Sequence, residues 1–199
     1  MKKILIATRN IGKLKEIKAA FAELRAEVLC LTDFENLPDA VEDGATFEEN
    51  ARIKAKFFNK LTGLACLADD SGLEVDVLHG APGVKSARFA GYHADDATNN
   101  SKLLAELKKI GVTHSPADYR CALVFIDADG TEISADGKID GTIKISPKGN
   151  GGFGYDPYFY ITDSKTMAEL TPAEKDAISH RGEALRKILP KLKDKFNLS

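Results

Sequence analysis

The sequence has 199 residues, with 28 basic against 30 acidic side chains and a formal net charge of −2. Its 43% hydrophobic and 29% charged content is typical of a globular protein with one core, and no apolar run is long enough to cross a membrane. The charge balance lacks the basic excess of a nucleic-acid-binding surface, although a local basic pocket can still hold a small polyanion. We therefore expect neither nucleic acid nor membrane as a partner.

Three cysteines, Cys30, Cys66 and Cys121, are an odd number, and each lies in an apolar stretch. We expect them to be reduced core residues. The apolar run from Ile4 to Ala7 is too short for the core of a signal peptide. Both features predict a cytoplasmic protein.

Strands and helices are expected to alternate along the first part of the chain. Strands are predicted in apolar runs at 3–7, 28–34, 64–68 and 119–126. Helices are predicted from apolar residues at helical spacing, at 11–24, 46–63, 103–110 and 171–190. The sequence places a polar turn at 69–72, after the third predicted strand. Two further turns, at 129–130 and 136–137, indicate an antiparallel meander. The pattern predicts a mixed α/β fold, parallel at first and antiparallel later.

The segment Thr8–Lys13 (TRNIGK) joins the first strand to the first helix. Asn10 is suited to cap this helix, whereas Lys13 puts a positive charge in the first turn, where the helix dipole disfavours it. A bound anion would remove the conflict, and a solvated surface lysine is the alternative. The segment lacks the glycine spacing of a Walker loop.

Acidic residues gather in two places, with Glu42 and Asp43 in a loop and Asp69 and Asp70 after the third predicted strand. Neighbouring side chains of an extended segment point to opposite faces, so only one of Asp69 and Asp70 is expected to face a ligand. One loop glutamate and one strand-end aspartate would suit Mg²⁺, which binds few carboxylates together with water and phosphate. Acids that only cap and solvate turns are the alternative.

The segment 149–157 (GNGGFGYDP) places four glycines around two aromatic residues and an aspartate. Glycines let a ligand approach the backbone closely. Phe153 or Tyr155 could stack on a base, and Asp156 could accept hydrogen bonds from its edge. The alternative is a flexible hairpin tip whose aromatic rings fold back into the core.

Four polar residues, Lys175, Ser179, His180 and Arg181, lie in the last predicted helix. Lys175 and Ser179 share a face of a regular helix, whereas His180 and Arg181 point elsewhere. The basic groups can serve one ligand only if the helix is interrupted after Lys175 or if long side chains reach different parts of the ligand. Surface charge on an amphipathic helix is the alternative.

Together these segments resemble the inosine triphosphate pyrophosphatase family, and in particular its bacterial dITP/XTP pyrophosphatase type. The resemblance spans nearly the whole chain and rests on six motifs in the family's order: TRNIGK (8–13), VEDGATFEENA (41–51), ADDSGLEVDVL (68–78), GAPGVKSARFAG (80–91), FGYDP (153–157) and SHRGEAL (179–185). Lys85 departs from the family, since many relatives carry an aromatic or apolar residue there.

The resemblance implies one domain over 1–199, with two lobes around a long mixed, partly antiparallel β-sheet with flanking helices, an active site in the cleft between the lobes, and a homodimer. It implies that Asp70 is the catalytic proton acceptor and that Glu42 and Asp70 bind Mg²⁺. The residues that it implies for binding the nucleotide are Thr8, Arg9, Asn10, Ile11, Gly12, Lys13, Lys54, Ser71, Phe153, Gly154, Tyr155, Asp156, Lys175, His180 and Arg181.

We therefore expect a magnesium-dependent hydrolase that cleaves the triphosphates of inosine, deoxyinosine and xanthosine to monophosphate and pyrophosphate. A pyrophosphatase for modified pyrimidine nucleotides is one alternative. A nucleotide sensor that binds without turnover is another, although the intact Asp70 argues against it. The preference between ribose and deoxyribose and any role of Asp69 beyond structure stay open.

Overall fold

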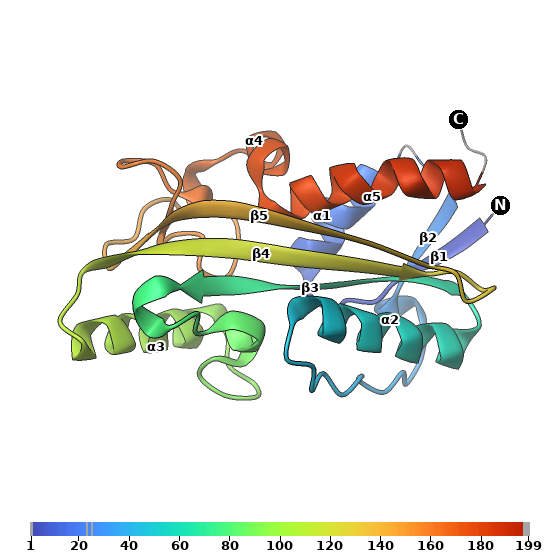
Figure 1. The fold of residues 1–199 in the computed structure, drawn as a ribbon, viewed down its shortest axis with the longest axis horizontal. Coiled ribbons are helices and arrows are strands. Elements are labelled where there is room, and N and C mark those ends of the chain that lie inside the picture. The colour runs from blue at the N-terminus through green and yellow to red at the C-terminus, as the bar shows by residue number, and fades with distance from the viewer. Residues whose placement is uncertain (1, 23, 25, 197–199) are drawn as a thin grey trace. The chain divides into compact units, whose positions relative to one another are not determined.

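The computed structural model describes residues 2–22, 24 and 26–196 and shows a mixed α/β fold, as predicted (Figure 1). Its strands are β1 (Lys2–Ile6), β2 (Ala26–Cys30), β3 (Ala65–Val75), β4 (His114–Ile126), β5 (Glu132–Lys144) and β6 (Phe159–Tyr160). Its helices are α1 (Ile11–Phe21), α2 (Phe47–Thr62), α3 (Asp96–Lys109), α4 (Pro172–Ile178) and α5 (His180–Phe196). The strands form a six-stranded sheet in the order β2-β1-β3-β4-β5-β6. Among the described residues, no helix combines the length and apolar character that a transmembrane span requires.

The chain divides into two compact units. The first unit comprises the chain up to Asp70, the segment Cys121–Gly137 and the chain from Arg181 onward. The second comprises Ser71–Arg120 and Lys138–His180. Because β3, β4 and β5 each pass a unit boundary, each of these strands contributes residues to both cores.

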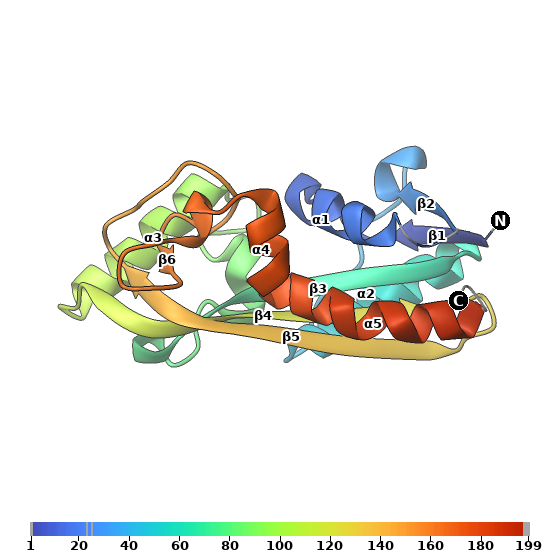
Figure 2. The same ribbon diagram turned by 90° about the horizontal axis from the view of Figure 1, so that it is seen from above.

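In the first unit, β1 pairs in parallel with both β2 and β3. Helices α1 and α5 share one apolar cluster with β1, β3 and β4, in which Ile17 and Ile188 are fully buried. Figure 1 shows α2 on the opposite face of the sheet from α5, and Figure 2 shows α1 beside β1 and β2. Helix α2 has the predicted capping box of Thr46 and Glu49 and ends at Gly63, whose φ of +70° suits glycine.

In the second unit, α3 packs its buried residues Leu103 and Leu107 into a cluster with β3, β4, β5 and β6. Strands β5 and β6 are antiparallel, with Ile143 opposite Phe159. The buried side chains of this unit also include polar residues, among them Asn100, Asp156 and Lys175.

Several predicted boundaries were wrong. Strand β3 continues to Val75, so Asp69 and Asp70 lie within a strand and not in a turn. Likewise β5 runs unbroken from Glu132 to Lys144 through the predicted turn at 136–137, because pairing in a sheet overrides weak local turn preference. The second strand ends at Cys30, since the Asp33 carboxylate accepts the Cys30 N–H and closes a short 3₁₀ turn over Leu31–Asp33.

The last predicted helix is two helices. Helix α4 ends at Ile178, Ser179 is extended with a ψ of 156°, and α5 begins at His180. An interruption after Lys175 is one of the two arrangements that allow the basic residues to serve one ligand, and the structure has this interruption. Pro190 lies inside α5 and does not end it. The prediction of free, buried cysteines is confirmed for Cys30, Cys66 and Cys121.

Candidate active site

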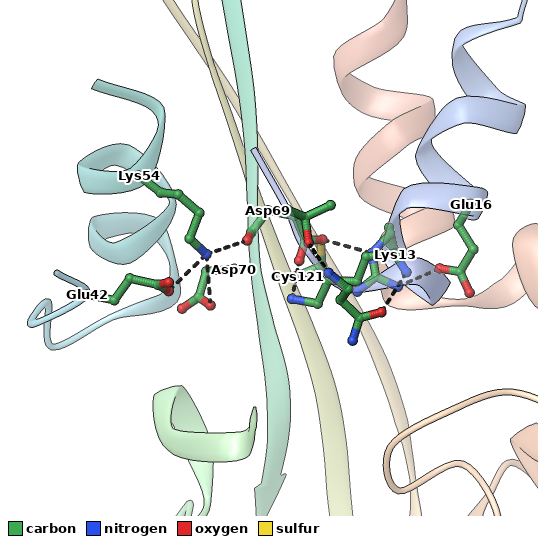
Figure 3. A network of polar contacts seen from close by, with 10 residues as sticks. Lys13, Glu16, Glu42, Lys54, Asp69, Asp70 and Cys121 are labelled. Atoms are coloured by element: carbon green, nitrogen blue, oxygen red, sulfur yellow. Dashed lines mark hydrogen bonds and ion pairs between the residues drawn. The ribbon is translucent and has the colours of Figure 1, made fainter. Parts of the chain in front are cut away.

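The two neighbouring aspartates of β3 lie in different surroundings within the first unit. Figure 3 shows Asp70 on one side of the strand, with Glu42 and Lys54. Asp69 lies on the other side, facing α1. The predicted alternation of the two side chains is therefore confirmed, and it follows from the extended backbone of β3.

The Asp70 cluster consists of Glu42, Lys54 and Asp70. Lys54 projects from the second turn of α2, and its Nζ lies 2.9 Å from Glu42 Oε2 and 4.0 Å from Asp70 Oδ1. The same Nζ donates a hydrogen bond of 3.0 Å to the backbone carbonyl of Asp69. One ammonium group is thus shared by two carboxylates, which leaves the cluster with a net negative charge when both carboxylates are ionised.

One oxygen of Asp70, Oδ2, is buried and accepts no hydrogen bond from the residues that the structure describes. Burial raises the pKa of Asp70 to about 6, although Lys54 and Lys13 act in the opposite direction. A buried carboxylate oxygen without a donor is unfavourable and therefore marks a candidate functional site. Asp70 lies inside a strand, where an apolar side chain would fill the same space without this unfavourable burial.

The Asp70 cluster fits Mg²⁺ as a partner. The described residues contain no group of three or more His, Cys, Asp or Glu side chains suited to hold a metal. Mg²⁺ does not need one, since it binds through one or two carboxylates and takes its other oxygen ligands from water and substrate phosphates. Glu42 and Asp70 supply two carboxylates, and Asp70 Oδ2 is a buried acceptor with no hydrogen-bond donor in the part of the chain that the structure describes.

The Asp69 cluster consists of Lys13, Glu16, Asp69, Cys121 and Arg181. Asp69 Oδ1 forms an ion pair with Lys13, and Asp69 Oδ2 accepts hydrogen bonds from Arg181 Nε at 2.8 Å and Cys121 Sγ at 3.2 Å. Arg181 is 1% exposed and also pairs with Glu16. Burial by itself would raise the pKa of Asp69, but Arg181 and Lys13 lower it well below its usual value. Asp69 therefore remains ionised and binds two residues that the resemblance assigns to the substrate.

The first loop has the predicted cap. Asn10 Oδ1 accepts the Lys13 N–H at 3.0 Å, and Thr8 Oγ1 accepts the Asn10 N–H at 3.1 Å. Arg9 points to the loop before α2, where it pairs with Asp39. Gly12 is partly buried in the first turn of α1, beside the exposed Ile11.

The Lys175 cluster, in the second unit, consists of Phe153, Asp156 and Lys175. Lys175 is buried, and its Nζ lies 2.6 Å from Asp156 Oδ2 and 4.3 Å from the centre of the Phe153 ring. Asp156 Oδ2 also accepts the Phe153 N–H at 3.0 Å. A Cβ on Gly152, whose φ is +72°, would collide with Asp156 Oδ2. The glycine therefore makes room for the carboxylate to turn back on its own loop.

The remaining residues of the expected base pocket differ in exposure. His180 is buried and stacks on the Tyr119 ring at a centroid distance of 4.8 Å and an interplanar angle of 15°. Tyr155 is buried in the core, and its hydroxyl donates to the Ser86 carbonyl at 2.8 Å, which leaves Phe153 as the accessible aromatic ring of this loop. Ser71, which the resemblance assigns to the substrate but not to the base pocket, is partly buried in β3.

Sequence reasoning missed Glu16 and Cys121 as partners of the Asp69 cluster. Neither residue belongs to a motif, and Arg181 is 112 residues from Asp69 in the chain. The helical spacing of α1 could have indicated Glu16, since Lys13 and Glu16 lie three residues apart and so share a face of the helix.

Comparison with known proteins gives matches over nearly the whole chain. A family model described as the Ham1 family matches residues 4–191. A dITP/XTP pyrophosphatase of Geobacter sulfurreducens is 48% identical over 186 residues, which cover 93% of this chain and 94% of that protein. Among solved structures, a HAM1 protein from Coxiella burnetii has a TM-score of 0.87 at 40% identity and covers 98% of this chain and 100% of that one. A nucleoside-triphosphatase (dITP/XTP pyrophosphatase) from Mycobacterium abscessus has a TM-score of 0.74 at 47% identity, and the match covers 94% of this chain and 99% of that one.

Proposed function

Because the chain belongs to the Ham1 family, we propose that it hydrolyses non-canonical purine nucleoside triphosphates, including ITP, dITP and XTP, to the monophosphate and pyrophosphate. The observation that carries this proposal is Asp70. It is a buried acid in a strand core with one oxygen that accepts no hydrogen bond from the described residues, and it stands beside Lys54 and Glu42. A protein selected for stability alone would replace such an acid.

We assign the proton transfer to Asp70, which would accept a proton from the water that attacks the α-phosphorus. The new bond forms between the water oxygen and the α-phosphorus, and the bond to the bridging oxygen breaks, so that pyrophosphate leaves. Lys54 is the cation of this cluster and would stabilise the negative charge that grows on the leaving group. Glu42 and Asp70 are the residues that would hold Mg²⁺, which when bound neutralises phosphate charge and lowers the pKa of a bound water.

The Lys175 cluster would read the base. A 6-oxopurine presents an acceptor where adenine presents an amino donor, so an ammonium group directed at that position favours hypoxanthine and xanthine over adenine. Lys175 is already desolvated and paired with Asp156, and Phe153 offers a ring for stacking on the base. His180 and Arg181 are the further residues proposed for this part of the substrate.

A substrate panel with resolved products tests the proposal. The wild-type protein, supplied with Mg²⁺, is incubated with ITP, XTP, GTP, ATP and a modified pyrimidine triphosphate, and the products are separated by chromatography. We expect the highest kcat/KM for ITP or XTP, with monophosphate and pyrophosphate as products. Diphosphate and orthophosphate as primary products would contradict the proposed cleavage position. Preference for pyrimidines, or binding without turnover, would favour one of the two alternatives.

Magnesium dependence, the homodimer and the cytoplasmic location stay predictions. Activity should disappear with a chelator and return on addition of Mg²⁺. Sedimentation equilibrium of the wild-type protein tests the homodimer.

A further inference from the structure

Two side chains of α3 hold both backbone polar groups of Gly154. Asp96 Oδ2 accepts the Gly154 N–H at 2.7 Å, and Asn100 Nδ2 donates to the Gly154 carbonyl at 2.9 Å. Asp96 and Asn100 are four residues apart on α3 and therefore lie on the same face of the helix. Gly154 has a φ of +63°, in the left-handed region that favours glycine. We call this arrangement the α3 clamp.

The clamp is not explained by stability alone. Asn100 is buried, and its Oδ1 accepts no hydrogen bond from the described residues. An unsatisfied buried acceptor is unfavourable and offsets what the single bond from Nδ2 to Gly154 contributes. An apolar residue of the same shape would remove this unsatisfied oxygen, but it would also leave the Gly154 carbonyl without its Asn100 donor. The amide is thus better explained by a requirement for a fixed position of Gly154.

Gly154 adjoins the residues that would read the base. The preceding residue, Phe153, donates its N–H to Asp156, and Asp156 returns its own N–H to the Phe153 carbonyl at 3.3 Å. The Asp156 carboxylate then binds Lys175. A displacement of Gly154 would therefore move the Phe153 ring and the partner of the Lys175 ammonium together.

We propose that Asp96 and Asn100 are positioning residues for base selection, which hold Gly154 so that Phe153 and Lys175 keep one geometry toward a 6-oxopurine. Neither residue needs to contact the nucleotide, since both act through the backbone of Gly154. The identity of the ligand rests on the proposed function, whereas the clamp rests on the two hydrogen bonds.

The first test uses Asp96→Ala, because Asp96 is exposed and its loss does not disturb the core. Asp96→Asn is the rescue variant, since its side-chain oxygen can still accept the Gly154 N–H. Ser101→Ala is the matched control, because it removes a side-chain bond of α3 that goes to Ala97 in the same helix. A hydrogen bond contributes about 0.5–1.5 kcal/mol, so we expect the ratio of kcat/KM for ITP to that for ATP to fall by up to about tenfold in Asp96→Ala and to stay unchanged in the other two.

The second test needs no substrate. Hydrogen exchange of the Gly154 amide should accelerate by up to about tenfold in Asp96→Ala and stay as in wild type in Ser101→Ala. Asn100→Leu keeps the side-chain size and removes the amide, so it should lower the ITP to ATP ratio. Its melting temperature should stay close to that of wild type, because the unsatisfied Oδ1 is lost together with the bond from Nδ2 to Gly154. Wild-type exchange in Asp96→Ala overturns the clamp, and accelerated exchange with an unchanged ratio overturns its role in base selection. A wild-type protein that does not hydrolyse ITP contradicts the proposed function and leaves the clamp to be decided by exchange.

Discussion

Replacing Asp70 by Asn should stabilise the metal-free protein and strongly lower its turnover. Burial raises the pKa of Asp70 from its ordinary 3.8 to about 6, which corresponds to a penalty of about 3 kcal/mol for the ionised form in the folded state. Asparagine keeps the shape without the charge but brings its own desolvation, so we expect a gain of about 1–2 kcal/mol in the free energy of unfolding at pH 8. In a chain of 199 residues this raises the melting temperature by about 2–8 °C.

The sign of the pH dependence follows from the raised pKa. Protonation of Asp70 contributes stability that is fully present below pH 3.8 and is lost as the pH rises through about 6. The advantage of Asp70→Asn over wild type should therefore be absent near pH 3.8, grow up to about pH 6 and then stay constant. Turnover of ITP at pH 8 should fall by about two orders of magnitude or more.

The assay is thermal and denaturant unfolding at several pH values in the presence of a chelator. Asp69→Asn is the matched control, because Asp69 is the neighbouring strand residue with the opposite environment and should lose stability. A second series with millimolar Mg²⁺ should stabilise wild type more than Asp70→Asn, because a ligand stabilises the state that binds it. The reasoning is refuted if Asp70→Asn unfolds more easily than wild type at pH 8 without metal.

Three further variants extend the predictions. Asp69→Asn should lower the free energy of unfolding, measured by denaturant unfolding, by about 3 kcal/mol, because Arg181 would stay buried with a weakened partner. A loss below about 1 kcal/mol would show that the ion pair of Asp69 with Arg181 does not stabilise the fold. Lys175→Met should lower the ratio of ITP to ATP efficiencies by about tenfold or more in steady-state kinetics, and a wild-type ratio would show that Lys175 does not read the base. Gly152→Ala should push Asp156 away from Lys175 and lower the same ratio of efficiencies. Its left-handed backbone should also cost about 1–2 kcal/mol of stability, measured by thermal unfolding. A variant with the wild-type ratio and stability would contradict the tight fit at Gly152.

Local signals in the sequence predicted the elements that short-range interactions control. The capping box of Thr46 and Glu49 and the left-handed Gly63 fix the ends of α2, and each of these signals lies within one helical turn of the boundary that it sets. The alternation of Asp69 and Asp70 was predicted in the same way, because it depends only on an extended backbone. The family motifs then indicated which residues to examine for nucleotide chemistry.

Other features depended on partners that are distant in the sequence. Sheet pairing carries β5 through Asp136 and Gly137, although these two residues by themselves favour a turn. Tyr155 can be buried because its hydroxyl donates a hydrogen bond to the Ser86 carbonyl, which lies 69 residues earlier. The sequence left both outcomes open for this tyrosine, because an aromatic residue among glycines can serve a ligand or a core.

The sequence by itself determined the α/β class, the ends of the capped helices and the opposite faces of Asp69 and Asp70, since each depends on contacts within a few residues. Tertiary structure alone decided that Asp69 binds Lys13 and Arg181 while Asp70 keeps an oxygen without a donor among the described residues. The two acids have the same side chain and adjacent positions. What separates them is the element packed against each face of β3. Asp69 binds Lys13 and Arg181 directly, which lowers its pKa, whereas Asp70 lies 4.0 Å from a lysine that it shares with Glu42, so that burial raises its pKa.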